Sequence, residues 1–404
     1  MQKVNQKPNF EFVAMMAALM SIVALAIDAI LPAISNIGTA INSTDPTDNQ
    51  LLVTMIFLGL GVGQLFFGPI SDSFGRKPVV YIGFVIFLLA SMICLYAPSL
   101  EIMVIGRILQ GIGLSAPRTI SISIIRDTYE GDYMAKIMSF VVAFFILVPV
   151  VAPAIGKLIL DAAGWKSIFY VQMVFVLAVA IWFWKRQKET LHPEYKIPFT
   201  GHVFIDGVKE FMKYKETVAF TLTSGLVTGA FLVYLSSAQH IFEDQYALKE
   251  MFPYIFAGLA VSIGLSTFLN GTLVMRFGMR KLSLMATIIF CVVAIAYSIL
   301  FLNSPNPSIY VLVGFLSVQF FCLGFMWGNF RSIAMEPIGH IAGIGAAING
   351  FVSTLLSIPI ATFIGEFVKD SVWPLFAGLA ICGLCALTIF LLVNKPKRKR
   401  VVTT

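Results

Sequence analysis

Charged side chains are scarce in this sequence. Asp, Glu, Lys and Arg make up 12% of its 404 residues, and hydrophobic residues make up 58%. A soluble globular protein carries about 25% charged residues. This composition argues against an ordinary soluble protein and predicts a polytopic membrane protein, in which the lipid bilayer is a partner along most of the chain.

Cysteine and histidine are also few, and they form no recognisable site. All five cysteines lie inside apolar runs, so we expect no disulfide. Cys382 and Cys385 form a Cys-x-x-Cys without a second pair or a nearby His, which favours packing over metal binding. The four histidines form no His-Glu-x-x-His, and no paired membrane aspartates or Walker-type phosphate loop are found. We therefore expect no enzymatic activity, no metal and no cofactor.

Long apolar runs fill most of the chain. A transmembrane helix needs about 20 predominantly apolar residues. The runs of this length are 11–33, 50–70, 79–97, 101–125, 136–160, 166–185, 217–240, 252–275, 282–302, 309–333, 342–366 and 373–393. The first run lacks a small-residue cleavage site and has full spanning length, so we expect it to be a retained helix. Twelve spans place both termini on one side of the membrane.

The sign of the charges differs between the two sets of loops. Basic residues, among them Arg76, Lys77 and the tail 395–400, lie at the termini and in loops after even-numbered spans. The opposite loops carry Asp45, Asp48, Asp161, Glu243, Asp244, Glu250 and Asp370. The positive-inside rule therefore predicts cytoplasmic termini. The +7 net charge reflects this distribution, and the tail is better explained by anionic lipid than by nucleic acid or a nuclear signal.

The chain divides into two similar halves. We expect six-helix bundles at 1–186 and 216–394, a cytoplasmic linker at 187–215 and a basic tail at 395–404. Helical spacing of Phe204, Val208, Phe211 and Met212 in the linker suggests a short surface helix, and the start of the seventh span is the alternative. A shift of 203 positions aligns 271–281 with 68–78 without gaps. The predicted fold is an all-α membrane protein of twelve transmembrane helices in two pseudo-symmetric halves, with a substrate path between them.

Three ionisable residues stand out inside the predicted spans: Asp28, Arg107 and Arg118. Such residues are costly in a membrane and are functional candidates. Asp28 lies roughly 8 Å from the expected outer end of its helix, level with Arg107, and Arg118 lies roughly 16 Å deeper. Burial raises the pKa of an aspartate and a nearby arginine lowers it. Asp28 is therefore the expected proton-coupling group with Arg107 as its partner, and a permanent ion pair is the alternative.

Several motifs resemble those of one transporter family. The stretch Gly68-Pro69-Ile70-Ser71-Asp72-Ser73-Phe74-Gly75-Arg76-Lys77-Pro78 resembles the signature loop between helices 2 and 3 of the major facilitator superfamily. Asp28-Ala29-Ile30-Leu31-Pro32 is similar to the helix 1 motif of drug:proton antiporters. Arg107-Ile108-Leu109-Gln110-Gly111 is similar to their helix 4 motif, whose arginine is implicated in proton transfer.

A further motif lies in the fifth span. Ala152-Pro153-Ala154-Ile155-Gly156 looks like the core of the antiporter motif Gly-x-x-x-Gly-Pro-x-x-Gly-Gly, with Val148, Ala152 and Lys157 each replacing a glycine. With Gly63-Gln64, Arg126-Asp127 and the stretch 164–169, the chain most resembles the bicyclomycin/chloramphenicol-resistance (Bcr/CflA) subfamily. The resemblance implies a multi-pass protein of the bacterial inner membrane that confers antibiotic resistance by multidrug efflux. We expect a monomer.

The signature loop has an expected role of its own. Asp72 is placed to cap a helix start or to pair with a cation such as Arg126, and Gly75 permits a turn that a side chain would block. The resemblance implies that one set of residues holds the cytoplasmic gate closed when the cavity faces outward. The set consists of Gly68, Asp72, Gly75, Arg76, Lys77 and Arg126. A purely topological role for the two basic residues is the alternative.

Substrate residues are less well marked. Candidates for the cavity wall, each of which could instead pack between helices, are Gln64, Gln110, Phe144, Tyr234, Gln319 and Asn329. Arg118 places a positive charge near the middle of the membrane, and no acidic residue is expected at that depth. Such a cavity should disfavour lipophilic cations and accept neutral or anionic compounds. The expected function is proton-coupled antiport of such drug-like compounds by alternating access. Export of an endogenous anion such as a siderophore, or a facilitator or importer on the same fold, remains open.

Overall fold

The structure is a bundle of long helices. It is a computed structural model that describes residues 10–43, 46–129, 131–191, 193–196, 201–302 and 304–393, and every regular element within these ranges is helical. The first part of the chain forms α1 (Phe10–Asp28), η1 (Leu31–Ala33), α2 (Ile34–Ala40), η2 (Pro46–Gln50), α3 (Leu51–Phe74), α4 (Arg76–Leu95), α5 (Leu100–Thr128), α6 (Gly131–Ala163) and α7 (Trp165–Arg186).

The second part repeats this arrangement after a short connection. Its elements are η3 (Pro193–Tyr195), α8 (Gly201–Lys213), α9 (Lys215–Gln239), η4 (His240–Gln245), α10 (Phe252–Phe277), α11 (Met279–Leu300), α12 (Ile309–Met335), η5 (Glu336–Ile341), α13 (Ala342–Gly365) and α14 (Trp373–Val393). Among the described residues, 11 helical segments are long and apolar enough to cross a membrane. Together with the 33-residue α6 they match the predicted runs, which confirms the all-helical membrane fold.

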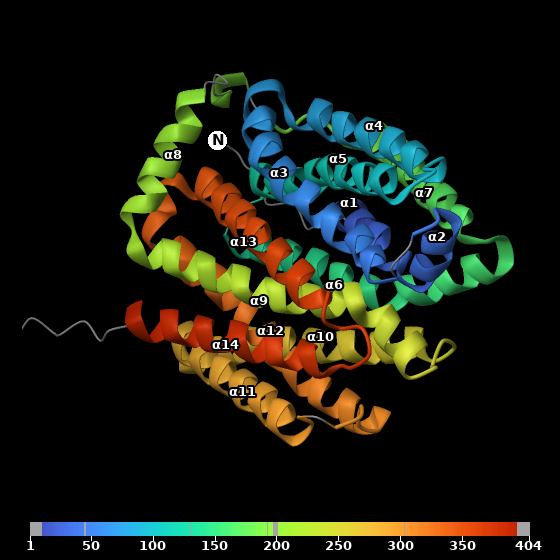
Figure 1. Cartoon of the computed structure of the whole chain (residues 1–404). Coiled ribbons are helices and arrows are strands. Elements are labelled where there is room, and N and C mark those ends of the chain that lie inside the picture. Colours follow the sequence, from blue (N-terminus) through green and yellow to red (C-terminus); the bar gives the residue numbers. More distant parts are fainter. Residues whose placement is uncertain are drawn as a thin grey trace, which may run out of the picture.

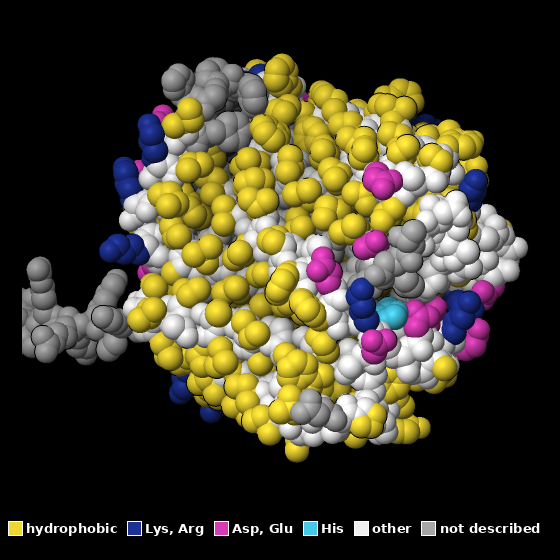
Figure 2. All heavy atoms as spheres, in the orientation of Figure 1, with side chains coloured by type: hydrophobic (Ala, Val, Ile, Leu, Met, Phe, Trp, Pro, Cys, Tyr) yellow, Lys and Arg dark blue, Asp and Glu magenta, His cyan; other side chains and the backbone are white. Residues whose placement is uncertain are grey.

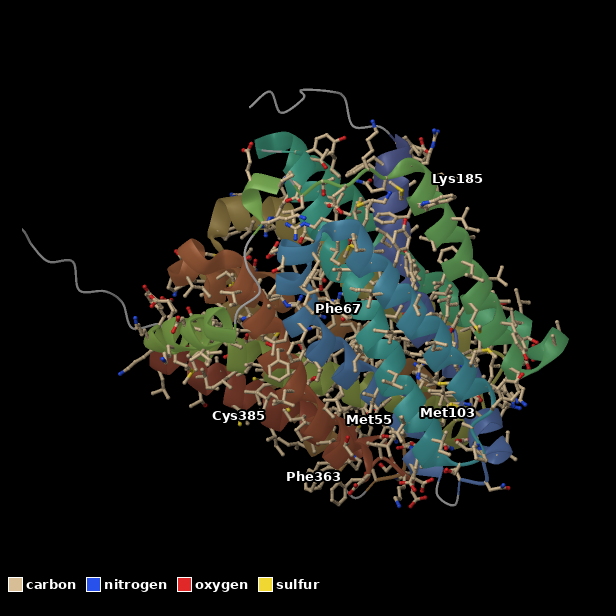
Figure 3. All side chains as sticks on the ribbon, turned by 90° about the horizontal axis from the view of Figure 1, so that it is seen from above. Met55, Phe67, Met103, Lys185, Phe363 and Cys385 are labelled. Carbon is tan, nitrogen blue, oxygen red and sulfur yellow. The ribbon has the colours of Figure 1, made fainter. Side chains whose placement is uncertain are left out.

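Helices α1 and α3–α7 form one half of the molecule, and α9–α14 form the other (Figure 1). The halves meet where α3 packs along α13 and α6 packs along α10. We call the end that carries α8 the α8 end, and the opposite end, which carries α2, the α2 end. In Figure 3, Met103 near the start of α5 and Phe363 near the end of α13 lie toward one end, and Lys185 near the end of α7 lies toward the other.

The surface matches a membrane protein. Figure 2 shows apolar side chains across the middle of the visible face. Lys and Arg side chains lie on its left margin, beside α8, and others lie on the right, among most of the visible acidic side chains. Within α8, Phe211 is buried against Ile338 and Ile348, whereas Val208 and Met212 are exposed. The side chain of Phe204 lies outside the described residues, and Tyr214 separates α8 from α9.

Two of the helix boundaries differ from those expected. The connection in the signature stretch is shorter than the predicted runs 50–70 and 79–97 imply, because α3 continues to Phe74 and α4 begins at Arg76. The reversal is made at Gly75 alone, with φ of 108°, a conformation that favours glycine. Gly278, which lies 203 positions later, separates α10 from α11 with φ of 79°. The two glycines that the repeat aligns therefore make similar turns.

The first helix also differs from its prediction. We expected one span from 11 to 33, but α1 stops at Asp28 and the helical segment resumes through η1 and α2 to Ala40. Pro32 lies in the first turn of η1, where its missing N–H costs no helical hydrogen bond. About 18 Å of helical rise, rather than 8 Å, therefore separates Asp28 from the end of the segment. Asp28 lies well inside the bundle.

Candidate functional site

Arg107 on α5 holds the break in α1. Its Nη1 and Nη2 each donate to the carbonyl oxygen of Ala26 at 3.2 Å, and its Nε donates to that of Leu52 at 2.7 Å. Because α1 stops at Asp28, the carbonyl groups of its last turn lack helical partners. A cation is also favourable at a helix C-terminus. Arg107 is completely buried, so these hydrogen bonds fix α1 against α3 and α5.

Asp28 and Arg107 do not form the ion pair that was the alternative to proton coupling. Instead, Arg107 Nη1 also donates to the side-chain oxygen of Gln110, at 2.7 Å. The side-chain N–H of Gln110 donates to the Ser91 hydroxyl on α4 at 2.8 Å. The sequence could not show this, because the competing acceptors are backbone carbonyl groups freed by the break. Arg107 is thus a positioning residue for the turn that carries Asp28.

Asp28 faces the other half of the molecule. Its side chain is 5% exposed, and no described residue forms a hydrogen bond or an ion pair with its carboxylate. It lies within electrostatic range of Tyr234 on α9. Tyr234 is also buried, and its hydroxyl has no hydrogen-bond partner among the described residues. The junction between the halves therefore contains a buried acid and a buried phenol whose polar atoms have no hydrogen-bond partner among the described residues.

Arg118 lies nearer the α8 end of α5, half-buried. It is within electrostatic range of Arg331 on α12. Our reading of the sequence did not single out Arg331, although a charge inside the predicted span 309–333 was a sufficient signal. The structure thus places two basic side chains, one from each half, near one another.

The remaining residues predicted to line the cavity differ in where they lie. Gln64 lies against α13 of the other half, where its Oε1 would be 2.9 Å from a Cβ at Gly350. Gln110, Gln319 and Asn329 are buried and bonded within their own half: Gln319 donates to the Phe290 carbonyl, and Asn329 exchanges hydrogen bonds with Asn270. Phe144 belongs to α6, but its side chain lies outside the described residues.

The signature residues form an ion-pair cluster at the α8 end. Arg76 Nε lies 2.9 Å from Asp127 Oδ2 at the end of α5, and Arg76 also pairs with Asp72. Asp72 therefore pairs within its own motif rather than with Arg126, which is exposed. A Cβ at Gly68 would meet nothing within 4 Å.

The start of α4 is capped from a distant part of the chain. The carboxylate of Glu189, beyond α7, accepts hydrogen bonds from the backbone N–H groups of Arg76 and Lys77, both at 3.0 Å. Lys77 Nζ in turn donates to the Gln187 carbonyl at 2.6 Å. A Cβ at Gly75 would lie 2.9 Å from Glu189 Oε2, so the glycine also provides room for the cap. Sequence reasoning missed Glu189, because nothing near it in the chain marks its partner.

This cap predicts a pH-dependent stability. Burial acts to raise the pKa of Glu189, but its backbone hydrogen bonds outweigh burial and lower the pKa below its ordinary value of 4.5. The stabilisation is therefore full above about pH 4.5 and is lost as the pH falls through the folded-state pKa. Glu189→Gln should lower the thermal unfolding temperature at pH 7, with a loss of about 1 kcal/mol for the cap. This difference from the native protein should shrink as the solution is acidified.

Glu194→Gln is the matched control, because Glu194 belongs to the same connection and is exposed. It should unfold like the native protein at every pH. An unchanged unfolding temperature for Glu189→Gln at pH 7 would contradict the capping role.

The antiporter-like motif of the fifth span lies against the break in α1. A Cβ at Gly156 would lie only 2.0 Å from the Ala29 carbonyl oxygen, so α6 and α1 touch through backbone atoms. Ala152 and Pro153 are buried on the same helix. The motif thus supports the turn that follows Asp28.

Polar contacts join the two halves at the α2 end. Lys157, which replaces a glycine of the motif, pairs with Asp161 at 2.7 Å and with Glu250 of the other half at 3.2 Å. Gln239 donates to the Ser35 hydroxyl at 2.9 Å, and Gln50 donates to the Gly365 carbonyl at 3.4 Å. The replacement therefore supplies a contact between the two halves at this end.

Comparison with known proteins identifies the family. The Major Facilitator Superfamily model matches residues 15–362. The uncharacterized MFS-type transporter YdgK of Bacillus subtilis is 28% identical over 345 residues, which cover 84% of this chain and 85% of the relative. A bicyclomycin resistance protein homolog of Haemophilus influenzae is 26% identical over 408 residues, covering 98% and 99%.

A solved structure has the same fold. The partially occluded inward-open conformation of the xylose transporter XylE from E. coli superposes with a TM-score of 0.73 at 14% identity, covering 97% of this chain and 99% of XylE. The family match covers most of the chain, and the structural match shows the same fold. The chain belongs to the major facilitator superfamily, as its motifs predicted, and is a multi-pass secondary transporter of small molecules.

Proposed function

We propose that this transporter exports small neutral or anionic drug-like compounds in exchange for protons. The observation that carries the proposal is Asp28, a carboxylic acid buried at the junction of the halves with no partner among the described residues. An ionisable group in a membrane-spanning segment is rare and usually serves transport or proton transfer. The name of the Haemophilus relative, a bicyclomycin resistance protein homolog, supports the drug-like substrate.

In the proposed cycle, the protein binds either the proton or the substrate, but not both at once. A protonated Asp28 is neutral, and its burial carries no charge penalty. When the cavity opens to the cytoplasm, substrate entry favours release of the proton there. When it opens to the outside, a proton returns to Asp28 and the substrate leaves. Arg107 keeps the turn at Asp28 in place during this cycle.

Alternating access uses the two ends of the interface in turn. We take the α8 end as cytoplasmic because the basic residues Arg76, Lys77 and Lys185 lie there, following the positive-inside rule. Opening the α2 end requires the contact of Lys157 with Glu250 to break. The proposed gate at the α8 end consists of the signature residues around Gly75, and Gly68 leaves room there for the other half to approach.

A second candidate function is export of an endogenous organic anion. Arg118 and Arg331 favour it, because two basic side chains near one another suit a negatively charged cargo. The coupling to protons is the same for both cargoes.

The direction of coupling is tested in inside-out membrane vesicles with radiolabelled chloramphenicol as a neutral probe. The native protein should accumulate the probe when the vesicle interior is acidic, and a protonophore should abolish this accumulation. Uptake that equilibrates at the same rate with and without the pH gradient would contradict antiport and favour a facilitator.

A further inference from the structure

Arg118 and Arg331 come from opposite halves of the molecule. Helix α5 packs against α3 and α4, whereas α12 packs against α9, α10 and α11. The two guanidinium groups are nevertheless within electrostatic range of each other. Neither has a carboxylate or a hydrogen-bond acceptor as a partner among the described residues. Like charges near one another repel, and a bound anion relieves this repulsion.

Open space lies next to Arg331. Gly328, one helical turn earlier on α12, is exposed, and a Cβ placed on it would meet nothing within 4 Å. The Arg331 side chain is itself exposed, although α12 is packed against three helices. Arg331 therefore borders open space.

An aromatic surface begins one turn from Arg331. Trp327 precedes Arg331 by four residues, so both side chains lie on one face of α12. The Trp327 ring packs edge-on against Phe231 on α9, with 4.8 Å between centroids. Phe231 in turn contacts Tyr234, the residue near Asp28. The indole N–H of Trp327 is buried and has no hydrogen-bond partner among the described residues.

We propose that Arg118 and Arg331 bind the carboxylate of an amphipathic organic anion whose flat apolar part rests on Trp327 and Phe231. The guanidinium group matches the two oxygens of a carboxylate, and such charge-assisted hydrogen bonds are about twice as strong as neutral ones. Trp327 presents a rigid aromatic surface to a ring. A cation of the same shape meets the repulsion of both arginines.

This assignment deepens the proposed export function, because it narrows the cargo to aromatic carboxylates. Binding is the measurement of choice, since it does not require proton coupling. The probes share one ring system and differ in charge: 1-naphthoate, 1-naphthamide and 1-naphthylmethylammonium. Their affinities for the purified full-length protein are compared by isothermal titration calorimetry at pH 7.

The native protein should prefer the carboxylate over the amide by about tenfold, and the cation should bind more weakly than either. Arg331→Gln should abolish this preference, and Arg331→Lys should restore part of it. Arg276→Gln removes an exposed arginine on α10 that exerts no electrostatic effect on Arg118 or Arg331, and it should keep the native preference. Equal affinities of the native protein for naphthoate and naphthamide would overturn the assignment, as would an unchanged preference in Arg331→Gln.

The binding experiment can fail or succeed independently of the proposed proton antiport. Asp28→Asn should retain the preference for naphthoate, because Asp28 does not contact the arginine pair. A protein that prefers naphthoate but shows no proton-driven transport would leave the subsite standing and refute antiport. Proton-driven transport of chloramphenicol without a preference for naphthoate would support antiport and refute the subsite.

Discussion

Asp28→Asn is expected to abolish proton-driven accumulation of substrate while passive exchange of substrate continues. Asparagine has nearly the same volume as aspartate but cannot bind and release a proton. The hydrogen bonds of Arg107 to Ala26 and Leu52 do not involve the Asp28 side chain, so the break in α1 should persist. In inside-out vesicles, uphill chloramphenicol uptake should fall to that of vesicles without the protein, and exchange against unlabelled chloramphenicol should remain.

The control for this substitution is Asp48→Asn. Asp48 is exposed in η2 at the α2 end, and its substitution should leave uphill uptake at the native level. Full gradient-driven uptake by the Asp28 variant would show that the acid is only structural. Loss of exchange as well as uptake, with the folded protein still present in the membrane, would show that Asp28 is needed for substrate movement itself.

A side chain at Gly156 is expected to disable the transporter. Even the single methyl group of Gly156→Ala would lie 2.0 Å from the Ala29 carbonyl oxygen, which is a backbone atom of the turn that follows α1. Overpacking of this kind costs about 1–3 kcal/mol, and more where the backbone must shift. We expect a lower thermal unfolding temperature and loss of transport, because α1 would move away from α6 at the turn that carries Asp28.

Gly314→Ala provides the comparison. Gly314 lies inside α12 and a Cβ there would meet nothing within 4 Å, so alanine should preserve transport. Alanine in a helix interior is also more favourable than glycine by about 0.5–1 kcal/mol. Equal stability and transport in the Gly156 and Gly314 variants would contradict a close contact between α1 and α6.

The helices could be predicted because hydrophobic length is a local property of the sequence. The repeat was visible for the same reason, since Gly75 and Gly278 impose similar turns on both halves. The break at Asp28 was missed because apolar residues continue past it, and only Pro32 marked it. The depth of Asp28 was misjudged as a consequence.

The contacts of the site residues depend on distant parts of the chain. Arg107 was paired with Asp28 by depth alone, whereas its acceptors are carbonyl groups that every residue carries. Lys157 departs from the antiporter motif, and its role emerged only with Glu250, 93 positions away. Glu189 has its partners 112 and 113 positions earlier. Motifs mark which residues matter, but not which groups they meet.

Exchange of a proton for substrate at Asp28 is tested most directly by infrared difference spectroscopy of the reconstituted protein. Addition of chloramphenicol at neutral pH should remove the carbonyl stretching band of a protonated carboxylic acid and produce a carboxylate band. The same difference should be absent from Asp28→Asn and present in Asp48→Asn. A spectrum without a carboxylic acid band change, or the same change in the Asp28 variant, would contradict proton exchange at this residue.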